Sequence, residues 1–233
     1  IMIKSYIPKR SKLSMIKQHI RSKILVRNIK KIFKKNFNQL KEGINVLEYG
    51  PGYGDLAVEL SKAFKIKNYF FVDHSKENLD YIQNILKVKN ASFFCHDANK
   101  LISEQVDINF NLVISSHVIE HLENPSKHLD DFYALLDRES YGLISTPNLD
   151  SLDAIKLGNN WRGYKDETHI SLLSYGELEK EIERKKFEIS LSGTSPNSLI
   201  EILYQKSLNS IFFSKFHLGD SSNIIFKKAT QNK

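Results

Sequence analysis

Three glycines at alternate positions are the part of this 233-residue sequence best suited to do chemistry: Gly50, Gly52 and Gly54. They lie between an apolar run, residues 44–49, and a helical pattern. Glycine has no Cβ, so the backbone of such a loop allows a ligand to approach closely. Asp73 ends the next apolar run, where a carboxylate can accept hydrogen bonds from both hydroxyls of a ribose. The spacing predicts a ligand that contains a nucleoside.

Further acids near the loop decide between two ligands of this kind. A dinucleotide site has the spacing Gly-x-Gly-x-x-Gly, with the pyrophosphate at the helix N-terminus. Here Asp55 occupies the sixth position, where its charge would oppose a pyrophosphate. Glu48 also enters the loop, and Asp97 follows the third apolar run. The acids therefore favour a cationic ligand, the sulfonium cofactor S-adenosylmethionine.

A histidine-rich segment follows the fourth apolar run, residues 110–116. Ligands of an open parallel sheet sit at the carboxyl ends of its strands, so this segment should lie beside the glycine loop. An imidazole titrates near neutral pH and suits the removal of a proton from a methyl acceptor. His121, and His169 in a later loop, are the predicted catalytic bases, and His117 is expected to help close the cofactor pocket. A purely structural role is the alternative for each histidine.

The elements that must position these residues alternate between apolar runs and helical patterns. Such alternation predicts βαβ units and one α/β, doubly wound domain built on a parallel sheet. The predicted strands cover residues 44–50, 68–73, 91–95, 110–116, 141–146, 187–193 and 223–228. The predicted helices cover residues 54–66, 76–88, 125–137 and 174–184, with one or two more within 196–218. Residues 147–170 are expected to be irregular.

The N-terminal segment, residues 1–43, differs in charge from the rest of the chain. It holds thirteen lysines and arginines against one acid, whereas residues 44–233 carry a net charge of −5. Apolar residues three to five apart over residues 11–40 predict an amphipathic helix, broken near Asn28, with a basic opposite face. The predicted organisation is a basic helical arm, 1–43, followed by a cofactor-binding domain, 44–233. The arm either packs on the body or contacts an anionic partner.

Composition excludes several classes of protein. With 41% apolar residues the chain can form a sizeable core, and it contains no apolar run of about 18 residues that could form a transmembrane segment. The single cysteine, Cys95, excludes an intramolecular disulfide or a multi-cysteine zinc site, and we expect it to be a small core residue. The N-terminus lacks the pattern of a secretory signal, so we expect a cytoplasmic protein. The oligomeric state is left open.

The sequence resembles the class I S-adenosylmethionine-dependent methyltransferases, in the broad group that acts on small molecules, quinones, lipids and sugars. The resemblance covers about residues 44–190 and is carried by LEYGPGYG, FFVDHS, HDAN, FNLVISSHVIEHLENP and the pattern from Trp161 to Ile189. It implies a Rossmann-like seven-stranded sheet with an antiparallel last strand, and S-adenosylhomocysteine as a product. It also assigns site residues: the methionine-side loop would be Glu48, Gly50, Gly52 and Gly54, the ribose acid Asp73 and the adenine-side acid Asp97.

A metal site is a further possibility that the resemblance raises. Some quinone and small-RNA methyltransferases of this type bind a divalent ion through Glu-x-x-Glu-His. This chain departs at the first position, where His117 replaces glutamate, so we predict no metal at His117, Glu120 and His121. Mixed imidazole and carboxylate ligands would favour a transition ion over magnesium. The same letters match the zinc-peptidase pattern His-x-x-Glu-His, but that motif requires a metalloprotease helix.

The methyl acceptor is less clearly specified. Resembling enzymes that methylate amino groups of nucleic acids carry an Asn-Pro-Pro-Tyr-type tetrapeptide after the fourth strand, where this chain has Ser115-Ser116-His117. An oxygen of a small molecule, sugar or lipid-linked glycan is therefore the favoured acceptor. Residues 147–170, with Trp161, and the apolar segment 196–218 are expected to cover the acceptor site.

Three alternatives stay open. An RNA methyltransferase could use the basic arm as an electrostatic guide, and its binding would then depend steeply on salt. A non-catalytic binding module could retain the fold and the cofactor. A nucleotide-dependent oxidoreductase would instead respond to NADH.

Overall fold

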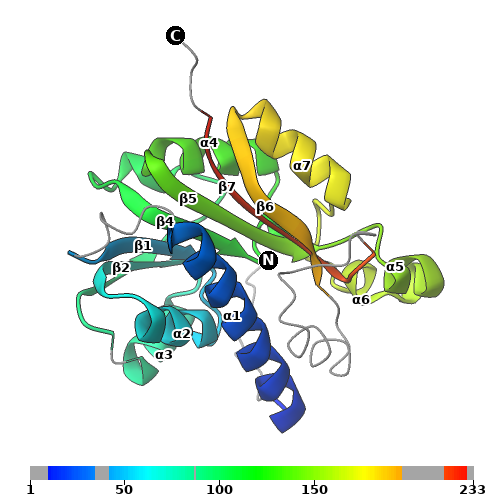
Figure 1. Ribbon diagram of the computed structural model, residues 1–233. Coiled ribbons are helices and arrows are strands. Elements are labelled where there is room, and N and C mark those ends of the chain that lie inside the picture. Colours follow the sequence, from blue (N-terminus) through cyan, green and yellow to red (C-terminus); the bar gives the residue numbers. More distant parts are fainter. Residues whose placement is uncertain (1–9, 35–41, 87, 196–217, 230–233) are drawn as a thin grey trace.

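The computed structural model describes residues 10–34, 42–86, 88–195 and 218–229, and its centre is a seven-stranded sheet of order β3-β2-β1-β4-β5-β7-β6 (Figure 1). Strand β7 pairs antiparallel with both β5 and β6, and the other neighbours pair in parallel. This arrangement confirms the α/β, Rossmann-like, doubly wound sheet with an antiparallel last strand. The strands are β1 (Ile44–Tyr49), β2 (Ile66–Asp73), β3 (Ala91–Cys95), β4 (Phe110–Ser116), β5 (Leu136–Pro147), β6 (Phe187–Ser195) and β7 (Ser221–Lys228).

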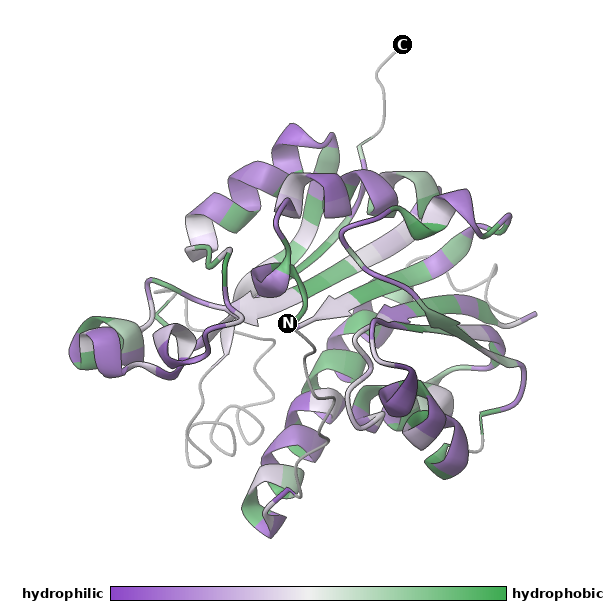
Figure 2. Ribbon diagram, turned by 180° about the vertical axis from the view of Figure 1, so that it is seen from behind, coloured by the Kyte–Doolittle hydropathy of each residue, from purple (hydrophilic) through white to green (hydrophobic). Residues whose placement is uncertain are grey.

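Helices cover both faces of the sheet. One face packs against α1 (Lys12–Phe33), α2 (Asp55–Ala63) and α3 (Lys76–Ile85), and the other against α4 (Pro125–Leu135) and α7 (Tyr175–Arg184). Alternate residues of a strand point to opposite faces, so Val46 packs in the first core and Leu47 in the second. Figure 2 shows the apolar strands between helices whose outer faces are polar.

The order of the strands decides where a ligand can bind. Strand β1 has β2 on one side and β4 on the other, so the chain leaves β1 in one direction and later returns in the other. In open α/β sheets the crevice at such a reversal, at the carboxyl ends of the strands, receives the ligand. The glycine loop after β1 and the histidine-rich segment after β4 meet there.

The N-terminal helix α1 differs from its prediction. It runs unbroken through Asn28, whose side-chain amide donates a hydrogen bond to the Ile24 carbonyl at 2.9 Å, so the predicted break is wrong. One face of its last turns is buried, and the Phe33 ring centroid lies 5.0 Å from that of Tyr141 on β5. The helix therefore shares the core of the sheet, while the division of the chain at residue 43 stays a prediction. None of the helices among the described residues is long and apolar enough to cross a membrane.

The segment after β5 is more ordered than its composition suggests. Residues 147–170 contain α5 (Leu152–Leu157) and α6 (Arg162–Lys165), so the prediction of an irregular stretch is wrong. The reason is local capping, because the Ser151 hydroxyl accepts a hydrogen bond from the Ala154 N–H at 3.0 Å. The described residues also include three short 3₁₀ turns: η2 (Ile102–Glu104), η3 (Ile119–His121) and η4 (Gly158–Asn160). The helices predicted within 196–218 fall almost entirely outside the described residues.

Cys95 is exposed and not part of the core. It is the last residue of β3, the edge strand of the sheet. The prediction that Cys95 is a small core residue is therefore wrong, because an edge strand has one side open to solvent.

Candidate functional site

A pocket of about 770 Å³ lies at the carboxyl ends of β1, β2, β3 and β4. Six of the predicted site residues line it: Gly50, Gly52, Asp73, Asp97, His117 and His121. They come from four separate loops, and the parallel strands bring those loops together. Three predicted site residues, Glu48, Gly54 and His169, do not line this pocket.

The glycine loop leaves open backbone facing the pocket. Gly52 has a φ of +53°, in the left-handed region, and a Cβ added there would meet nothing within 4 Å. Gly50 has a φ of +58°, and a Cβ there would lie 2.5 Å from the Val118 side chain. The loop therefore requires glycine at Gly50 for packing, and at Gly52 it leaves room for a ligand. Gly54 is the N-cap residue of α2.

Asp73 is held at the end of β2 with hydrogen-bonding capacity to spare. It is buried, and its Oδ1 accepts a hydrogen bond from the Ser75 N–H at 2.8 Å. Its Oδ2 has a longer contact, 3.4 Å, with the Asn78 side-chain amide. An ionised carboxylate offers about four acceptor positions, so Oδ2 can also accept from the hydroxyls of a ribose.

Asp97 lies across the same pocket and is exposed. The Asn99 backbone N–H donates to its Oδ1 at 2.9 Å and is the main reason that the pKa of Asp97 is lowered. The carboxylate is therefore ionised at neutral pH and is held toward the pocket by its own turn.

Glu48 lies behind the loop and lines a second, smaller pocket. It is buried, and Tyr69 donates a hydrogen bond to its Oε2 at 2.5 Å. Burial raises the pKa of Glu48 to about 7, although the Tyr69 hydrogen bond lowers it and the Asp55 charge adds a smaller increase. This carboxyl group therefore changes charge near neutral pH.

His117 has an unusual backbone for its residue type. Its φ is +56°, which is uncommon outside glycine and costs free energy unless neighbouring contacts hold it. Those contacts are the Ser145 carbonyl, which accepts from the His117 N–H at 2.8 Å, and Glu120 Oε1, 3.1 Å from the ring Nδ1. Buried Glu120 also accepts from the Thr146 hydroxyl at 2.9 Å. Burial raises the pKa of Glu120, but the hydrogen bond and charge of His117 outweigh it, so the net pKa is lowered.

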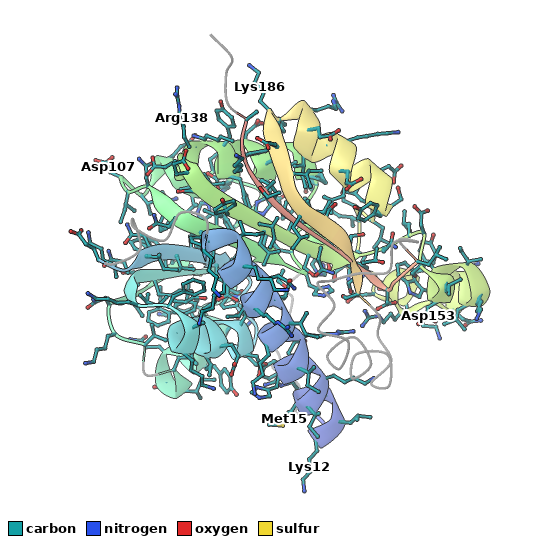
Figure 3. The ribbon with its side chains drawn as sticks, in the orientation of Figure 1. Lys12, Met15, Asp107, Arg138, Asp153 and Lys186 are labelled. Atoms are coloured by element: carbon teal, nitrogen blue, oxygen red, sulfur yellow. The ribbon has the colours of Figure 1, made fainter. Side chains whose placement is uncertain are left out.

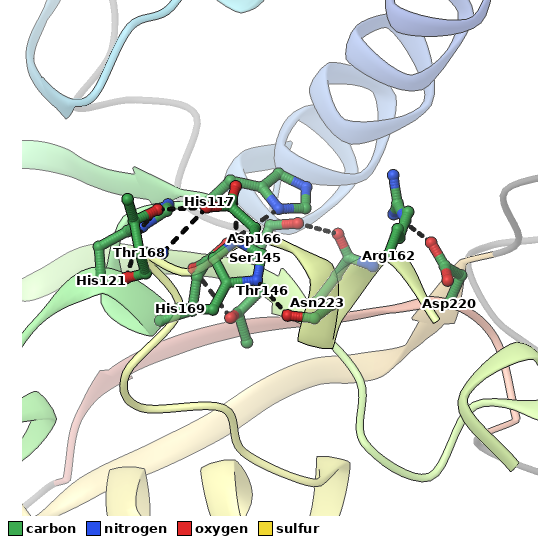
Figure 4. Close-up of polar contacts among 12 residues, drawn as sticks. His117, His121, Ser145, Thr146, Arg162, Asp166, Thr168, His169, Asp220 and Asn223 are labelled. Carbon is green, nitrogen blue, oxygen red and sulfur yellow. Dashed lines mark hydrogen bonds and ion pairs between the residues drawn. The ribbon is translucent and has the colours of Figure 1, made fainter. Parts of the chain in front are cut away.

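His121 and His169 face each other at the edge of the pocket. Their ring centroids are 4.8 Å apart, and the angle between the ring planes is 63° (Figure 4). His169 lies in a later loop, whose Thr168 is 47 positions after His121. The Nδ1 atom of His121 lies 3.2 Å from the Thr168 carbonyl, and that of His169 lies 2.8 Å from the Gly163 carbonyl. A carbonyl oxygen only accepts, so both Nδ1 atoms carry a hydrogen, and the Nε2 atom of a neutral His121 ring then keeps a lone pair.

The same region contains a group of possible metal ligands. Atoms of Glu120, His121 and His169 all lie within 4.8 Å of one another. His169 thus takes the place that His117 holds in the sequence pattern, because His117 directs its Nδ1 at Glu120. The prediction that the protein holds no metal stays a prediction.

Trp161, which the sequence predicts to cover the acceptor site, is a packing residue of the segment after β5. It is fully buried, and its ring N–H donates to Asp220 at 3.2 Å, while Arg162 forms an ion pair with the same carboxylate (Figure 4). Its ring is therefore packed inside the protein and does not face an acceptor. Tyr164, which is 51% exposed, packs edge-on against Trp161.

Sequence reasoning missed two residues that hold the histidine pair. Thr168 lines the pocket, and its hydroxyl lies 2.9 Å from His121 Nδ1. Asp166 lies 3.5 Å from His169 Nε2. Their own spacing was the available signal, because Asp166 accepts from the Thr168 N–H at 3.1 Å in a two-residue turn.

Comparison with known proteins places the chain among methyltransferases. The family model described as "Methyltransferase domain" matches residues 18–191. A curated relative, malonyl-[acyl-carrier protein] O-methyltransferase of Bacillus cereus, is 24% identical over 159 residues. The match covers 66% of this chain and 58% of that relative, so the chain spans little more than half of the relative's length.

Solved structures share the fold. The plantazolicin methyltransferase BamL, in complex with a triazolic desmethylPZN analog and SAH, has a TM-score of 0.65 at 16% identity, covering 94% of this chain and 87% of that one. An S-adenosylmethionine-dependent methyltransferase from Mesorhizobium loti has a TM-score of 0.60 at 12% identity, covering 81% and 93%. At these identities the likeness establishes the fold.

Proposed function

The chain belongs to the methyltransferase-domain family, and we propose that it transfers a methyl group from S-adenosylmethionine to an oxygen of a small molecule, sugar or lipid-linked glycan. One observation carries the proposal. A pocket that begins at the Gly52 backbone and the Asp73 carboxylate ends at a histidine whose Nε2 keeps a lone pair, His121. The pocket thus combines a site suited to a nucleoside with a side chain that can act as a general base.

The residues of the first pocket fit the adenosine part of this cofactor. Asp73 would accept from the ribose hydroxyls, Asp97 would lie on the adenine side, and Gly50 and Gly52 would lie under the methionine part. His117 would close the pocket from the end of β4. When bound, the cofactor supplies a methyl group on a sulfonium, which needs an aligned acceptor and little further activation.

The histidine pair would remove the acceptor's proton. His121 lines the pocket, and its Nδ1–H is held by Thr168, so its Nε2 is the available base. His169 packs against it, and Asp166 lies beside His169 Nε2. Burial raises the pKa of Asp166, but the Thr168 hydrogen bonds and the histidine charges lower it more, so the carboxylate is ionised. A negative charge there stabilises an imidazolium.

Three points support oxygen as the acceptor atom. Ser115-Ser116-His117 stands where an amino-methylating tetrapeptide would lie. The curated relative is an O-methyltransferase by name. An imidazole base also suits a hydroxyl, which must lose its proton as the new bond forms.

Calorimetric titration tests the cofactor assignment. S-adenosylmethionine and S-adenosylhomocysteine should both bind the purified protein, and NADH should not. Methyl transfer is then followed with tritiated S-adenosylmethionine against pools of hydroxylated small molecules, glycans and RNA. Label in RNA, with binding that falls steeply with salt, would favour the RNA alternative. Cofactor binding with no label in any pool would favour a non-catalytic module, and absence of cofactor binding would contradict the proposal.

A further inference from the structure

A second pocket, of about 450 Å³, lies between α1 and the glycine loop. The wall on the side of α1 includes Gln18 and Ser22 of the helix and Arg10, two residues before its start. This pocket shares three residues with the larger one: Gly50, Gly52 and His117. The two pockets therefore meet at the glycine loop, and a ligand that lies across the loop reaches both.

Arg10 is the only lysine or arginine among the described residues that line either pocket. Its guanidinium forms an ion pair with Asp55 at the start of α2 and lies 3.8 Å over the Tyr53 ring. The Arg10 side chain is only 16% exposed. A guanidinium has five N–H donors, so one carboxylate does not exhaust its capacity.

Ser22 gives an independent sign that this pocket receives a polar group. Its residue is 1% exposed, it lines the pocket, and its hydroxyl has no hydrogen-bond partner among the described residues. A buried hydroxyl without a partner costs free energy, so such groups usually mark a place where water or a ligand completes the bonding.

The proposed cofactor has two ends with different chemistry. Its adenosine end suits the first pocket, where Asp73 and Asp97 lie. Its amino-acid end carries an α-ammonium and an α-carboxylate, and a carboxylate at the glycine loop needs a cation. The second pocket contains that cation together with the carboxyl groups of Glu48 and Asp55.

We propose that Arg10 binds the α-carboxylate of S-adenosylmethionine, so that the start of α1 closes the amino-acid end of the cofactor site. This rests on the proposed function. Arg10 lies before residue 18, where the match to the family model begins. In the structure Asp55 holds the guanidinium over the glycine loop, and the cofactor's carboxylate shares or replaces that contact.

The test compares two ligands that differ only in that carboxylate. Dissociation constants of S-adenosylmethionine and of decarboxylated S-adenosylmethionine are measured by calorimetry for the wild type and for Arg10→Ala. A charge-assisted hydrogen bond accounts for about 10- to 100-fold in affinity, so Arg10→Ala should weaken the binding of S-adenosylmethionine by that factor. The same substitution should change the dissociation constant of the decarboxylated ligand by about twofold or less, because that ligand has no carboxylate for Arg10 to bind.

Two further variants distinguish a ligand-binding role of Arg10 from a purely structural one. Asp55→Asn breaks the ion pair of Arg10 but keeps the guanidinium, so it should not reproduce the loss that Arg10→Ala causes for S-adenosylmethionine alone. Any change in affinity that it causes should be equal for the two ligands. Lys12→Ala is the matched control, since Lys12 lies at the free end of α1 and points away from the body (Figure 3). Neither ligand's affinity should change in that control.

Several results would overturn the inference. Equal losses for both ligands in Arg10→Ala, or the same loss in Asp55→Asn, would show that Arg10 only fastens α1 to α2. Wild-type binding of both ligands with equal affinity would show that the carboxylate is not recognised, while the proposed function would stand. Binding of neither ligand to a folded wild type would overturn both proposals.

Discussion

The two halves of the candidate site are held together in different ways. On the side of β2 and β3, each acid is fixed by its own turn: Asp73 by the N–H of Ser75, and Asp97 by that of Asn99. On the side of β4 and β5, the contacts join distant parts of the chain. His121 contacts Thr168, and Glu120 accepts from Thr146.

This difference teaches what a motif can encode. A residue held by neighbours two positions away keeps its geometry wherever the strand ends, so its function is visible in a short pattern. A residue held by a loop 47 positions away depends on how the whole sheet places that loop. We therefore expect variants on the first side to act on cofactor affinity, and variants on the second side to act on turnover.

The largest effect is expected from the histidine pair. His169→Asn keeps a donor for the Gly163 carbonyl but removes Nε2, and His121→Asn does the same at Thr168. Loss of a general base lowers kcat by about 10²- to 10⁴-fold. Steady-state rates with an identified acceptor measure the effect, and the double variant should be no slower than the worse single one, because the pair acts as a unit.

The affinity for S-adenosylhomocysteine provides the control for that pair. His169 does not line the first pocket, so His169→Asn should change the dissociation constant by about twofold or less. A large loss of affinity with unchanged kcat would show that the pair positions the cofactor and is not the base.

Asp73→Ala should have the next largest effect, on binding. It removes the carboxylate placed for two ribose hydroxyls, and hydrogen bonds to a charged group make a loss of about 100-fold or more in affinity for S-adenosylhomocysteine. Calorimetry measures the change, with Asp80→Ala on the exposed face of α3 as the matched control. Wild-type affinity in Asp73→Ala would contradict the assignment of Asp73 to the ribose hydroxyls.

Glu48 predicts a dependence of stability on pH. Its pKa is raised from 4.5 to about 7 in the folded protein, mainly by burial, so the folded state holds the proton more tightly than the unfolded state. The stability that Glu48 contributes is complete below about pH 4.5 and is lost as the pH rises through 7, by about 3 kcal/mol in all. The glutamine side chain in the variant Glu48→Gln cannot titrate. As the pH rises over this range, the free energy of unfolding of the variant should therefore increase relative to that of the wild type.

Urea unfolding of both proteins at pH 5 and pH 8 measures the Glu48 effect. The free energy of unfolding of Glu48→Gln minus that of the wild type should be larger at pH 8 than at pH 5. The contributions of the other titrating groups cancel in this difference. A difference that is the same at both pH values would place the pKa of Glu48 in its ordinary range.

The smallest effect is expected at Thr168. Thr168→Val removes the hydroxyl that lies 2.9 Å from His121 Nδ1 but keeps the carbonyl that accepts from the same ring. The hydroxyl also donates to Asp166, but Asp166 keeps the Thr168 N–H as a donor. The loss that reaches His121 is one neutral hydrogen bond of about 1 kcal/mol, so kcat should fall by about fivefold. A fall as large as that of His121→Asn would mean that the hydroxyl, and not the carbonyl, holds the ring.

Much of the architecture is visible in the sequence because strands and helices follow local patterns. Apolar runs located six of the seven strands to within two residues at each end, while β5 begins at Leu136, five residues before the predicted start. The helix break at Asn28 and the irregular stretch 147–170 failed for one reason. A polar side chain can bond the helix backbone or cap a short helix, and composition does not distinguish these uses from a turn.

The sequence by itself determined the positions of the strands, the glycine loop and the acids that follow β2 and β3, because each depends on residues close together in the chain. Only the tertiary structure decided that His169 faces His121, that Trp161 is packed inside, and that Arg10 lies over the glycine loop. Those contacts join segments tens of residues apart. Their geometry is set by how helices and loops pack on the sheet, and no spacing within the sequence records it.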